Sequence, residues 1–172
     1  MKRRLCLKYL CTVAVSTAVL PRLSWAEHSG KGVSMEKITH SDEQWQSLLS
    51  PKAYDVLRHE GTEPAFSSPL NKEYGEGVYV CAGCALPLFQ SSAKFDSGTG
   101  WPSFFQPIEG HVDTKLDFKM ILPRHEYHCV RCGGHQGHVF KDGPEPTGQR
   151  WCNNGVALNF KPRLEIDATT KT

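Results

Sequence analysis

The sequence predicts a mainly β domain, made of antiparallel sheets of short strands, that opens with two short helices and carries a structural zinc site. Three observations predict this fold class. Apolar residues recur at helical spacing within residues 41–61. From residue 63 onward, glycine and proline separate short apolar runs, which is typical of strands joined by turns. Two C-x-x-C pairs, 44 residues apart, supply four cysteines at zinc-knuckle spacing.

Capping signals define the two helices. Ser41 and Gln44 have the spacing of a capping box. Ser50 is expected to cap a second helix, with Pro51 at its first position and Gly61 as its C-terminal stop. The apolar residues that follow these caps keep i, i+3, i+4 spacing: Trp45, Leu48 and Leu49, then Ala53, Val56 and Leu57.

The β region is predicted from short apolar runs bounded by turn residues. We expect strands at residues 78–80, 118–122, 127–130, 139–140 and 156–160. Each C-x-x-C pair follows a probable strand, residues 78–80 before Cys81 and residues 126–128 before Cys129, so distant parts of a sheet would meet at the metal.

The first 26 residues have the features of an export signal. Lys2, Arg3 and Arg4 form a basic start, an apolar run covers residues 10–20, and Ser24-Trp25-Ala26 offers a small-x-small cleavage site. The apolar run is shorter than the roughly 20 residues that span a bilayer. The segment Arg3-Arg4-Leu5-Cys6-Leu7-Lys8 resembles a twin-arginine signal, although an ordinary Sec signal is an alternative.

We therefore expect an exported protein, located in a bacterial periplasm, with a mitochondrial presequence as the alternative. The expected organisation is a cleaved signal at 1–26, a flexible lead at 27–37, one folded domain at 38–166 and a tail at 167–172. Removing the five basic residues of the signal changes the net charge from +2 to −3. A mildly acidic domain lacks the field needed to hold nucleic acid or an anionic membrane, so neither partner is expected. We expect a monomer.

The two C-x-x-C pairs predict one structural Zn²⁺ per chain. Small residues next to each pair allow backbone N–H groups to turn toward the sulfurs, and four thiolates close a tetrahedral shell with no position open for substrate. Two disulfides, which an oxidising compartment favours, are the alternative. The expected ligands are Cys81, Cys84, Cys129 and Cys132.

Cys152 is the one cysteine of residues 27–172 outside these pairs. A nucleophilic cysteine works as the thiolate, which a nearby cation or imidazole favours, and Arg150, His135 and His138 could provide that environment. Strand alternation would put the two histidines on opposite faces unless glycines bend the chain. An inert buried thiol is the alternative.

Four motifs in order resemble the methionine-(R)-sulfoxide reductase family, MsrB. Besides the two C-x-x-C pairs, they are Gly98-Thr-Gly-Trp101-Pro-Ser-Phe104, His135-x-Gly-His138-Val-Phe-x-Asp142-Gly-Pro, Arg150-x-Cys152-x-Asn154 and Leu158-x-Phe160. The resemblance extends from about residue 38 to about residue 164 and implies the zinc-bearing β fold of that family.

The resemblance implies a role for each motif residue. Cys152 would attack the sulfoxide sulfur and become a sulfenic acid while methionine leaves. Protonation of the sulfoxide oxygen calls for acids within hydrogen-bond reach. By this likeness the oxygen side is lined by His135, His138 and Asn154, the surrounding polar network contains Asp142 and Arg150, and Trp101 packs against the substrate methyl group.

Many members of the family have a resolving cysteine where this chain has Thr99. Without one, we expect the sulfenic acid to be reduced by an external thiol such as a thioredoxin-like protein, glutaredoxin or glutathione, with oxidised proteins as substrates. Two other classes compete with this interpretation. A zinc-ribbon binding module would have no turnover, and another thiol enzyme, such as a peroxidase, would prefer peroxide.

Overall fold

The structure is a computed structural model that describes residues 35–120 and 122–163. The expected export signal, most of the predicted lead and the predicted tail lie outside these residues. Within the described ranges, no helix has both the length and the apolar character needed to cross a membrane.

Both predicted helices are present, as α1 (Asp42–Leu48) and α2 (Pro51–His59). The capping box of α1 is formed, because the Ser41 hydroxyl accepts from the Gln44 N–H at 3.3 Å and the Gln44 side chain accepts from the Ser41 N–H at 2.8 Å. Ser50 caps α2, and Pro51 is its first residue.

The end of α2 differs from the prediction that Gly61 stops the helix. The left-handed residue that ends α2 is Glu60, with φ 57°, and Gly61 follows it. A Cβ on Gly61 would lie 2.1 Å from the Asp55 carboxylate. Glycine is therefore needed at this position for close approach to Asp55 and not for its backbone angle.

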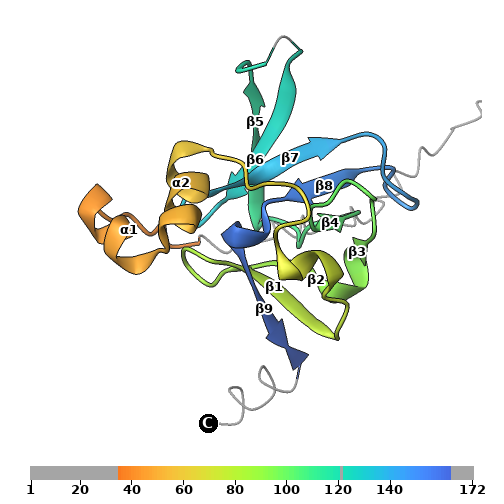
Figure 1. Cartoon of the computed structure of the whole chain (residues 1–172), viewed down its shortest axis with the longest axis horizontal. Helices are drawn as coiled ribbons and strands as arrows, with labels where there is room; N and C mark the ends of the chain where they lie inside the picture. Colours follow the sequence, from red (N-terminus) through yellow and green to blue (C-terminus); the bar gives the residue numbers. More distant parts are fainter. Residues whose placement is uncertain (1–34, 121, 164–172) are drawn as a thin grey trace, which may run out of the picture. The chain divides into compact units, whose positions relative to one another are not determined.

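The strands form two antiparallel sheets, which confirms the predicted fold class. In Figure 1 the smaller sheet lies in the lower part of the domain and the larger one above it. The smaller sheet has the order β2 (Pro87–Gln90), β1 (Gly77–Cys81), β9 (Leu158–Pro162). The larger sheet has the order β3 (Lys94–Phe95), β4 (Ser103–Phe104), β8 (Arg150–Asn153), β7 (His135–Phe140), β6 (Arg124–Cys129), β5 (Val112–Asp117).

The predicted strand at 118–122 is wrong. Strand β5 ends at Asp117, and the described residues between it and β6, 118–120 and 122–123, belong to the turn of the hairpin that projects at the top of Figure 1. The Asp117 carboxylate accepts the Lys119 N–H at 2.9 Å, which replaces the next ladder bond and turns the chain. The predicted run at 156–160 is divided between a short 3-10 helix (Gly155–Ala157) and β9.

Aromatic side chains from both sheets form the core between them. Phe89 stacks on Phe104 with ring centroids 4.1 Å apart, and Tyr79 meets Phe104 edge-on at 4.9 Å. Tyr127 of β6 contacts Trp151 of β8 at 5.0 Å. Because Trp151 faces this core and side chains alternate along a strand, its neighbour Cys152 faces the opposite side of the larger sheet.

Candidate functional site

Cys152 lies in β8, between β4 and β7, where strand pairing fixes its neighbours. Ser103 is its partner on β4 and His138 is its partner on β7. Directly opposed residues on one sheet face have Cβ atoms about 4.5–5.5 Å apart. The sheet therefore brings a thiol and an imidazole together from residues 14 positions apart in the sequence.

A β-bulge brings the second histidine to the same face. The β6–β7 ladder shifts register so that Gln136 has no partner on β6. The extra residue reverses the alternation between His135 and His138, and their rings approach to 5.5 Å between centroids. The Gln136 carbonyl accepts the N–H of Asn154 at 2.8 Å, in the register of the β7–β8 ladder. The bend expected from the glycines thus comes from Gln136.

Four of the predicted site residues, Cys152, His138, Asn154 and Trp101, line one cavity of about 130 Å³. This volume is well below the roughly 300–1,000 Å³ of pockets that enclose whole small molecules, so the cavity suits one side chain. The complete lining is Thr62, Trp101, Arg124, Gly137, His138, Phe140, Cys152, Asn153 and Asn154.

Arg150 and Asp142 form an ion pair and are not among the residues that line this cavity. The guanidinium donates to both carboxylate oxygens of Asp142 at 2.9 Å, and this pairing lowers the pKa of Asp142. The same guanidinium lies 4.3 Å from the centre of the Phe140 ring, which does line the cavity. The pair therefore supports the cavity wall through Phe140.

Burial governs the acidity of the Cys152 thiol. It raises the pKa of Cys152 above its ordinary value, and the opposing charge of Arg150 does not overcome this effect. Arg150 is already paired with Asp142, which reduces the field it exerts on the sulfur. The sequence-based expectation that nearby cations favour the thiolate therefore does not hold for the cavity without substrate.

The Trp101 indole is anchored by the segment after α2. Its Nε1–H donates to the Glu63 carbonyl at 3.1 Å, which leaves the ring as part of the cavity wall. Gly100, just before it, has φ +90°, and a Cβ there would lie 2.8 Å from the Phe66 ring. Glycine is thus required at this turn both for its angle and for the close approach of Phe66.

Asn154 connects the cavity to the surrounding backbone. Its side-chain oxygen accepts the Glu63 N–H at 3.0 Å, and its amide nitrogen donates to the Gln136 carbonyl at 3.1 Å. Because an amide group has two N–H donors, one donor of Asn154 is not used by the Gln136 bond.

Sequence reasoning missed Asp117 and Arg124, which border the cavity from the β5–β6 hairpin. Asp117 accepts from His138 Nε2 at 2.8 Å and from the Arg124 guanidinium at 2.9 Å. Two hydrogen bonds hold the pKa of Asp117 well below its usual range: the larger effect comes from the Lys119 N–H and the next from His138. Asp117 is therefore ionised. Burial lowers the pKa of His138 even so, and its neutral imidazole carries its proton on the nitrogen that faces Asp117.

Glu126, also missed, forms the matching pair with His135. Its carboxylate is 1% exposed and accepts from His135 Nδ1 at 2.6 Å and His128 Nδ1 at 3.1 Å. Burial disfavours its charge, yet the bonds from the two histidines outweigh burial and lower the pKa of Glu126 to about 2. The signal in the sequence was the period-two placement of charged residues along β5 and β6, which puts them on one sheet face.

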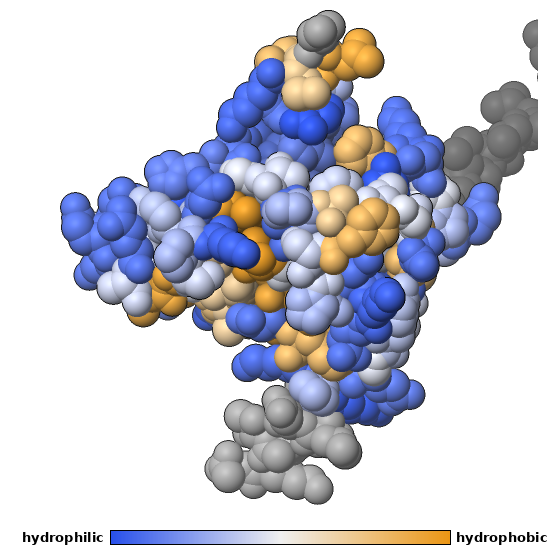
Figure 2. All heavy atoms as spheres, viewed as in Figure 1, coloured by the Kyte–Doolittle hydropathy of each residue, from blue (hydrophilic) through white to orange (hydrophobic). Residues whose placement is uncertain are grey.

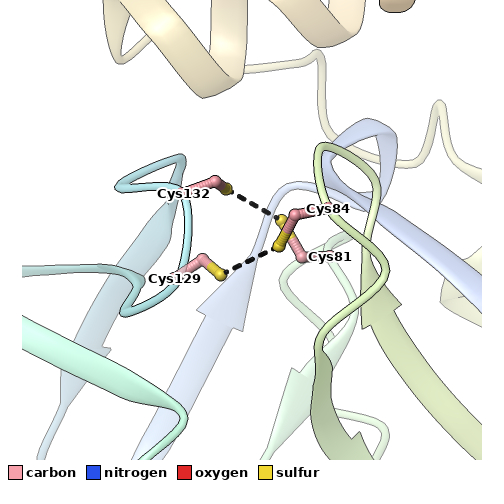
Figure 3. Close-up of side chains that lie close together, drawn as sticks. All are labelled: Cys81, Cys84, Cys129 and Cys132. Carbon is pink, nitrogen blue, oxygen red and sulfur yellow. Dashed lines mark hydrogen bonds between the residues drawn. The ribbon is translucent and has the colours of Figure 1, made fainter. Parts of the chain in front are cut away.

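The four cysteines of the C-x-x-C pairs meet near the start of β7. Figure 3 shows one pair at the end of β1 and on the loop that follows it, and the other at the end of β6 and on its following loop, with all four sulfurs converging. Cys81 and Cys132 have sulfurs 3.6 Å apart, and Cys84 and Cys129 have sulfurs 3.5 Å apart. All four sulfurs lie within 4.8 Å of one another.

This cluster has the geometry of a metal site. Four thiolates about 2.3 Å from one zinc ion lie about 3.8 Å apart at a tetrahedral angle, close to the spacing observed here. A disulfide needs sulfurs about 2.05 Å apart, and none of the cysteines in the described residues is bridged. Hydrogen bonding with Cys129 raises the pKa of both Cys81 and Cys132, so the crowded thiols need a cation in order to ionise together.

Helix α2 covers the cluster. The Arg58 guanidinium donates to the Cys132 carbonyl at 2.9 Å. A Cβ on Gly134 would lie 2.8 Å from the Leu57 side chain and 3.3 Å from the Cys132 sulfur. Glycine at this position therefore lets α2 pack directly over the sulfurs.

Comparison with known proteins decides the family. The SelR domain model matches residues 49–162, which include the cavity and the four-cysteine cluster. The chain is 51% identical over 129 residues to peptide methionine sulfoxide reductase MsrB of Bradyrhizobium diazoefficiens, which covers 74% of this chain and 93% of that protein. The chain belongs to the MsrB family.

Two further members illustrate its breadth. Peptide methionine sulfoxide reductase MsrB of Pseudomonas entomophila is 50% identical over 130 residues, 75% of this chain and 99% of that protein. The chloroplastic peptide methionine sulfoxide reductase B1 of Arabidopsis thaliana is 51% identical over 121 residues, 70% of this chain and 60% of that longer one.

Proposed function

We propose that this MsrB-family protein reduces methionine-(R)-sulfoxide in oxidised proteins, with Cys152 as the nucleophile. The observation that carries the proposal is the cavity, in which a thiol, an imidazole and an indole converge in a volume suited to one side chain. The three relatives described above, at 50–51% identity, are named peptide methionine sulfoxide reductases.

The proposed reaction transfers the sulfoxide oxygen to Cys152. Its sulfur attacks the sulfoxide sulfur and forms a sulfur–sulfur bond. The oxygen then moves to the Cys152 sulfur while the substrate sulfur–oxygen bond and the new sulfur–sulfur bond break, and methionine leaves as the thioether. The enzyme keeps the oxygen as a sulfenic acid, so Cys152 is oxidised by the two electrons that reduce the substrate. The thiol loses its proton to form the thiolate before the attack, and one proton is then delivered to the transferred oxygen to complete the sulfenic acid, which balances the step.

His138 is the proposed carrier of that proton. It is the cross-strand neighbour of Cys152 and lines the same cavity. Asp117 fixes the orientation of its ring and His135 packs against it. The unused amide hydrogen of Asn154 is available to the oxygen, and the Trp101 ring offers an apolar face to the substrate methyl group. Arg150 and Asp142 act by holding Phe140 in the wall.

An external dithiol or pair of thiols is proposed to complete the cycle. Among the described residues, Cys152 is the only cysteine that lines the cavity, and the other four are gathered in the cluster. The first thiol displaces the hydroxyl of the sulfenic acid as water and forms a mixed disulfide, and the second releases the Cys152 thiol. A thioredoxin-like protein, glutaredoxin or glutathione fits this requirement.

We propose that the cluster holds one structural Zn²⁺ through Cys81, Cys84, Cys129 and Cys132. A closed thiolate shell supplies folding energy and takes no part in the reaction. We also propose export of the protein to the periplasm, and replacement of Arg3 and Arg4 by lysine tests the twin-arginine route. Export that is unaffected by this change rules out that route.

A stereospecific assay tests the proposed function. The purified protein, supplied with excess dithiol, should reduce the R epimer of a peptide-bound methionine sulfoxide and leave the S epimer intact. A protein that reduces hydrogen peroxide in preference to either epimer would be a peroxidase. A protein with no turnover of either compound would be a binding module.

The raised pKa of Cys152 predicts the pH dependence of the reaction. Because the thiolate of the free enzyme is the nucleophile and burial raises the pKa of Cys152, kcat/KM should still be rising with pH above neutral. Alkylation of Cys152, followed by mass spectrometry, should rise in parallel without substrate present. A plateau that begins below neutral pH would show that the thiolate already dominates the free enzyme, contrary to this account.

Asp117→Asn tests the role given to the hairpin carboxylate. The variant loses the charge that orients His138 and pairs with Arg124, so kcat should fall by about 10–100-fold with little change in KM. The matched control is Asp113→Asn, which alters an exposed carboxyl on the same strand and should be silent. Equal kinetics for the two variants would remove Asp117 from the mechanism.

A further inference from the structure

An exposed apolar cluster stands beside the cavity, at the turn of the β5–β6 hairpin. Four side chains form this apolar tip: Leu116, Phe118, Met120 and Leu122, which are 54%, 69%, 59% and 77% exposed. In Figure 2, orange and tan spheres gather at the top of the hairpin, above its blue stem. Single exposed apolar residues are ordinary, but a contiguous group marks a surface that contacts a partner.

Charged contacts link the hairpin to the end of α2 and join its two strands. Glu60, at the end of α2, pairs with Lys115 and Lys119 at 2.6 Å each. Asp117 and Arg124 pair across the two strands at 2.9 Å. Lys115 of the stem and Lys119 of the turn thus contact Glu60, while the apolar side chains of the tip face solvent.

The tip lies close along the chain to two side chains at the cavity. Arg124 lines the cavity, and Asp117 binds the cavity residue His138. Phe118 directly follows Asp117, and Leu122 is two residues before Arg124. The whole tip is therefore within three residues of one of these two side chains, a reach of at most about 10 Å along an extended chain.

The cavity admits one side chain, so the rest of a protein substrate must lie on the surface around it. Methionine is mostly a core residue, and the residues on the same face, two positions away in a strand or three to four in a helix, are therefore often apolar as well. Oxidation makes that side chain polar and disrupts the packing around it, which exposes those neighbours. If an extended polypeptide placed its sulfoxide in the cavity, the residues one to three positions away would lie within about 10 Å of the cavity.

Resting on the proposed function, we infer that the apolar tip binds the apolar residues that flank methionine-(R)-sulfoxide in an unfolded polypeptide substrate. The tip would lower KM for such segments and leave the chemical step unchanged, because it touches the flanking residues and not the sulfoxide. It would also favour oxidised methionines from disrupted cores over those on polar surfaces.

The test compares three substrates that share one reacting group. They are a peptide with leucine, valine and phenylalanine within three residues of methionine-(R)-sulfoxide, a peptide with serine, glycine and lysine there, and a blocked single methionine-(R)-sulfoxide. The variant combines Phe118→Ser, Met120→Gln and Leu122→Gln. KM for the apolar peptide should rise about tenfold, whereas kcat for that peptide and all constants for the other two substrates should stay within about twofold.

The matched control is Leu48→Gln, which removes a 61% exposed leucine from α1 and should leave all three substrates unaffected. An unchanged KM for the apolar peptide in the combined variant overturns the inference while the proposed function stands. An equal loss for all three substrates also overturns it, because the hairpin would then support the cavity itself. No turnover by the wild type would instead remove the proposed function.

Two other occupants of the tip are outcomes of the same experiment. In one outcome the wild type sediments with vesicles of anionic phospholipid, the combined variant does not, and both have the same peptide kinetics. That result would assign the tip to a membrane surface. A wild-type dimer that becomes a monomer in the variant, again with unchanged kinetics, would assign it to a second copy of the chain. Either result overturns the binding of flanking residues.

Discussion

Cys152→Ser should lower the rate of methionine-(R)-sulfoxide reduction by at least about a thousandfold. Serine preserves the shape of the side chain, but its hydroxyl cannot form a sulfenic acid and stays protonated at every accessible pH. The thiol is half-buried in a cavity and bonds no metal in the proposed arrangement, so the variant should keep its metal content and its Tm.

The measurement pairs steady-state kinetics with metal analysis and thermal unfolding of the same preparation. Cys152→Ala should be as inactive as Cys152→Ser, because neither side chain is a thiol. Retention of more than about a tenth of the wild-type rate in either variant would assign the nucleophile to another residue.

Cys132→Ser should have the opposite profile, with lost metal and lost stability. A structural zinc ion contributes about 10–16 kcal/mol of apparent binding free energy, so removal of one of its four ligands is expected to cost about 3–5 kcal/mol. For a domain of this size the Tm should then fall by about 10–20 °C. Loss of the metal would also loosen the packing of α2 on the cluster, because Arg58 of this helix donates to the Cys132 carbonyl.

Cys152→Ser is the matched control for this variant, since both exchange one sulfur for oxygen. Metal content by elemental analysis and Tm by calorimetry separate the two substitutions. A Cys132→Ser protein with a full complement of zinc and an unchanged Tm would contradict the structural role of the cluster.

Local signals in the sequence predicted the elements that local physics decides. The Ser41 capping box and the Ser50-Pro51 start are formed by residues within one turn of each other, and both are present. The four zinc-knuckle cysteines were found because their spacing is itself the signal. By contrast, the apolar run at 118–122 matches a buried strand in composition, and only its position beyond Asp117 makes it an exposed turn.

The missed residues depend on pairing between distant segments. Asp117 and Glu126 belong to the site because each binds a histidine on β7, and this contact depends on how β5, β6 and β7 pair. Regular strand alternation predicts that His135 and His138 lie on opposite sheet faces. The bulge at Gln136 puts them on the same face, and it follows from the pairing register of β6 and β7. Neither pairing register nor a bulge is encoded at a fixed spacing along the chain.

The central claim is that four sulfurs hold a metal while a fifth carries the chemistry. Intact-mass and peptide mass spectrometry after a single turnover, with one equivalent of the R epimer and no reductant, tests this claim most directly. The account predicts one added oxygen atom on Cys152, with one zinc ion per chain still bound by the other four cysteines. A disulfide that joins Cys152 to any cysteine of the cluster, or full activity in a chain whose cluster is oxidised and free of metal, would contradict it.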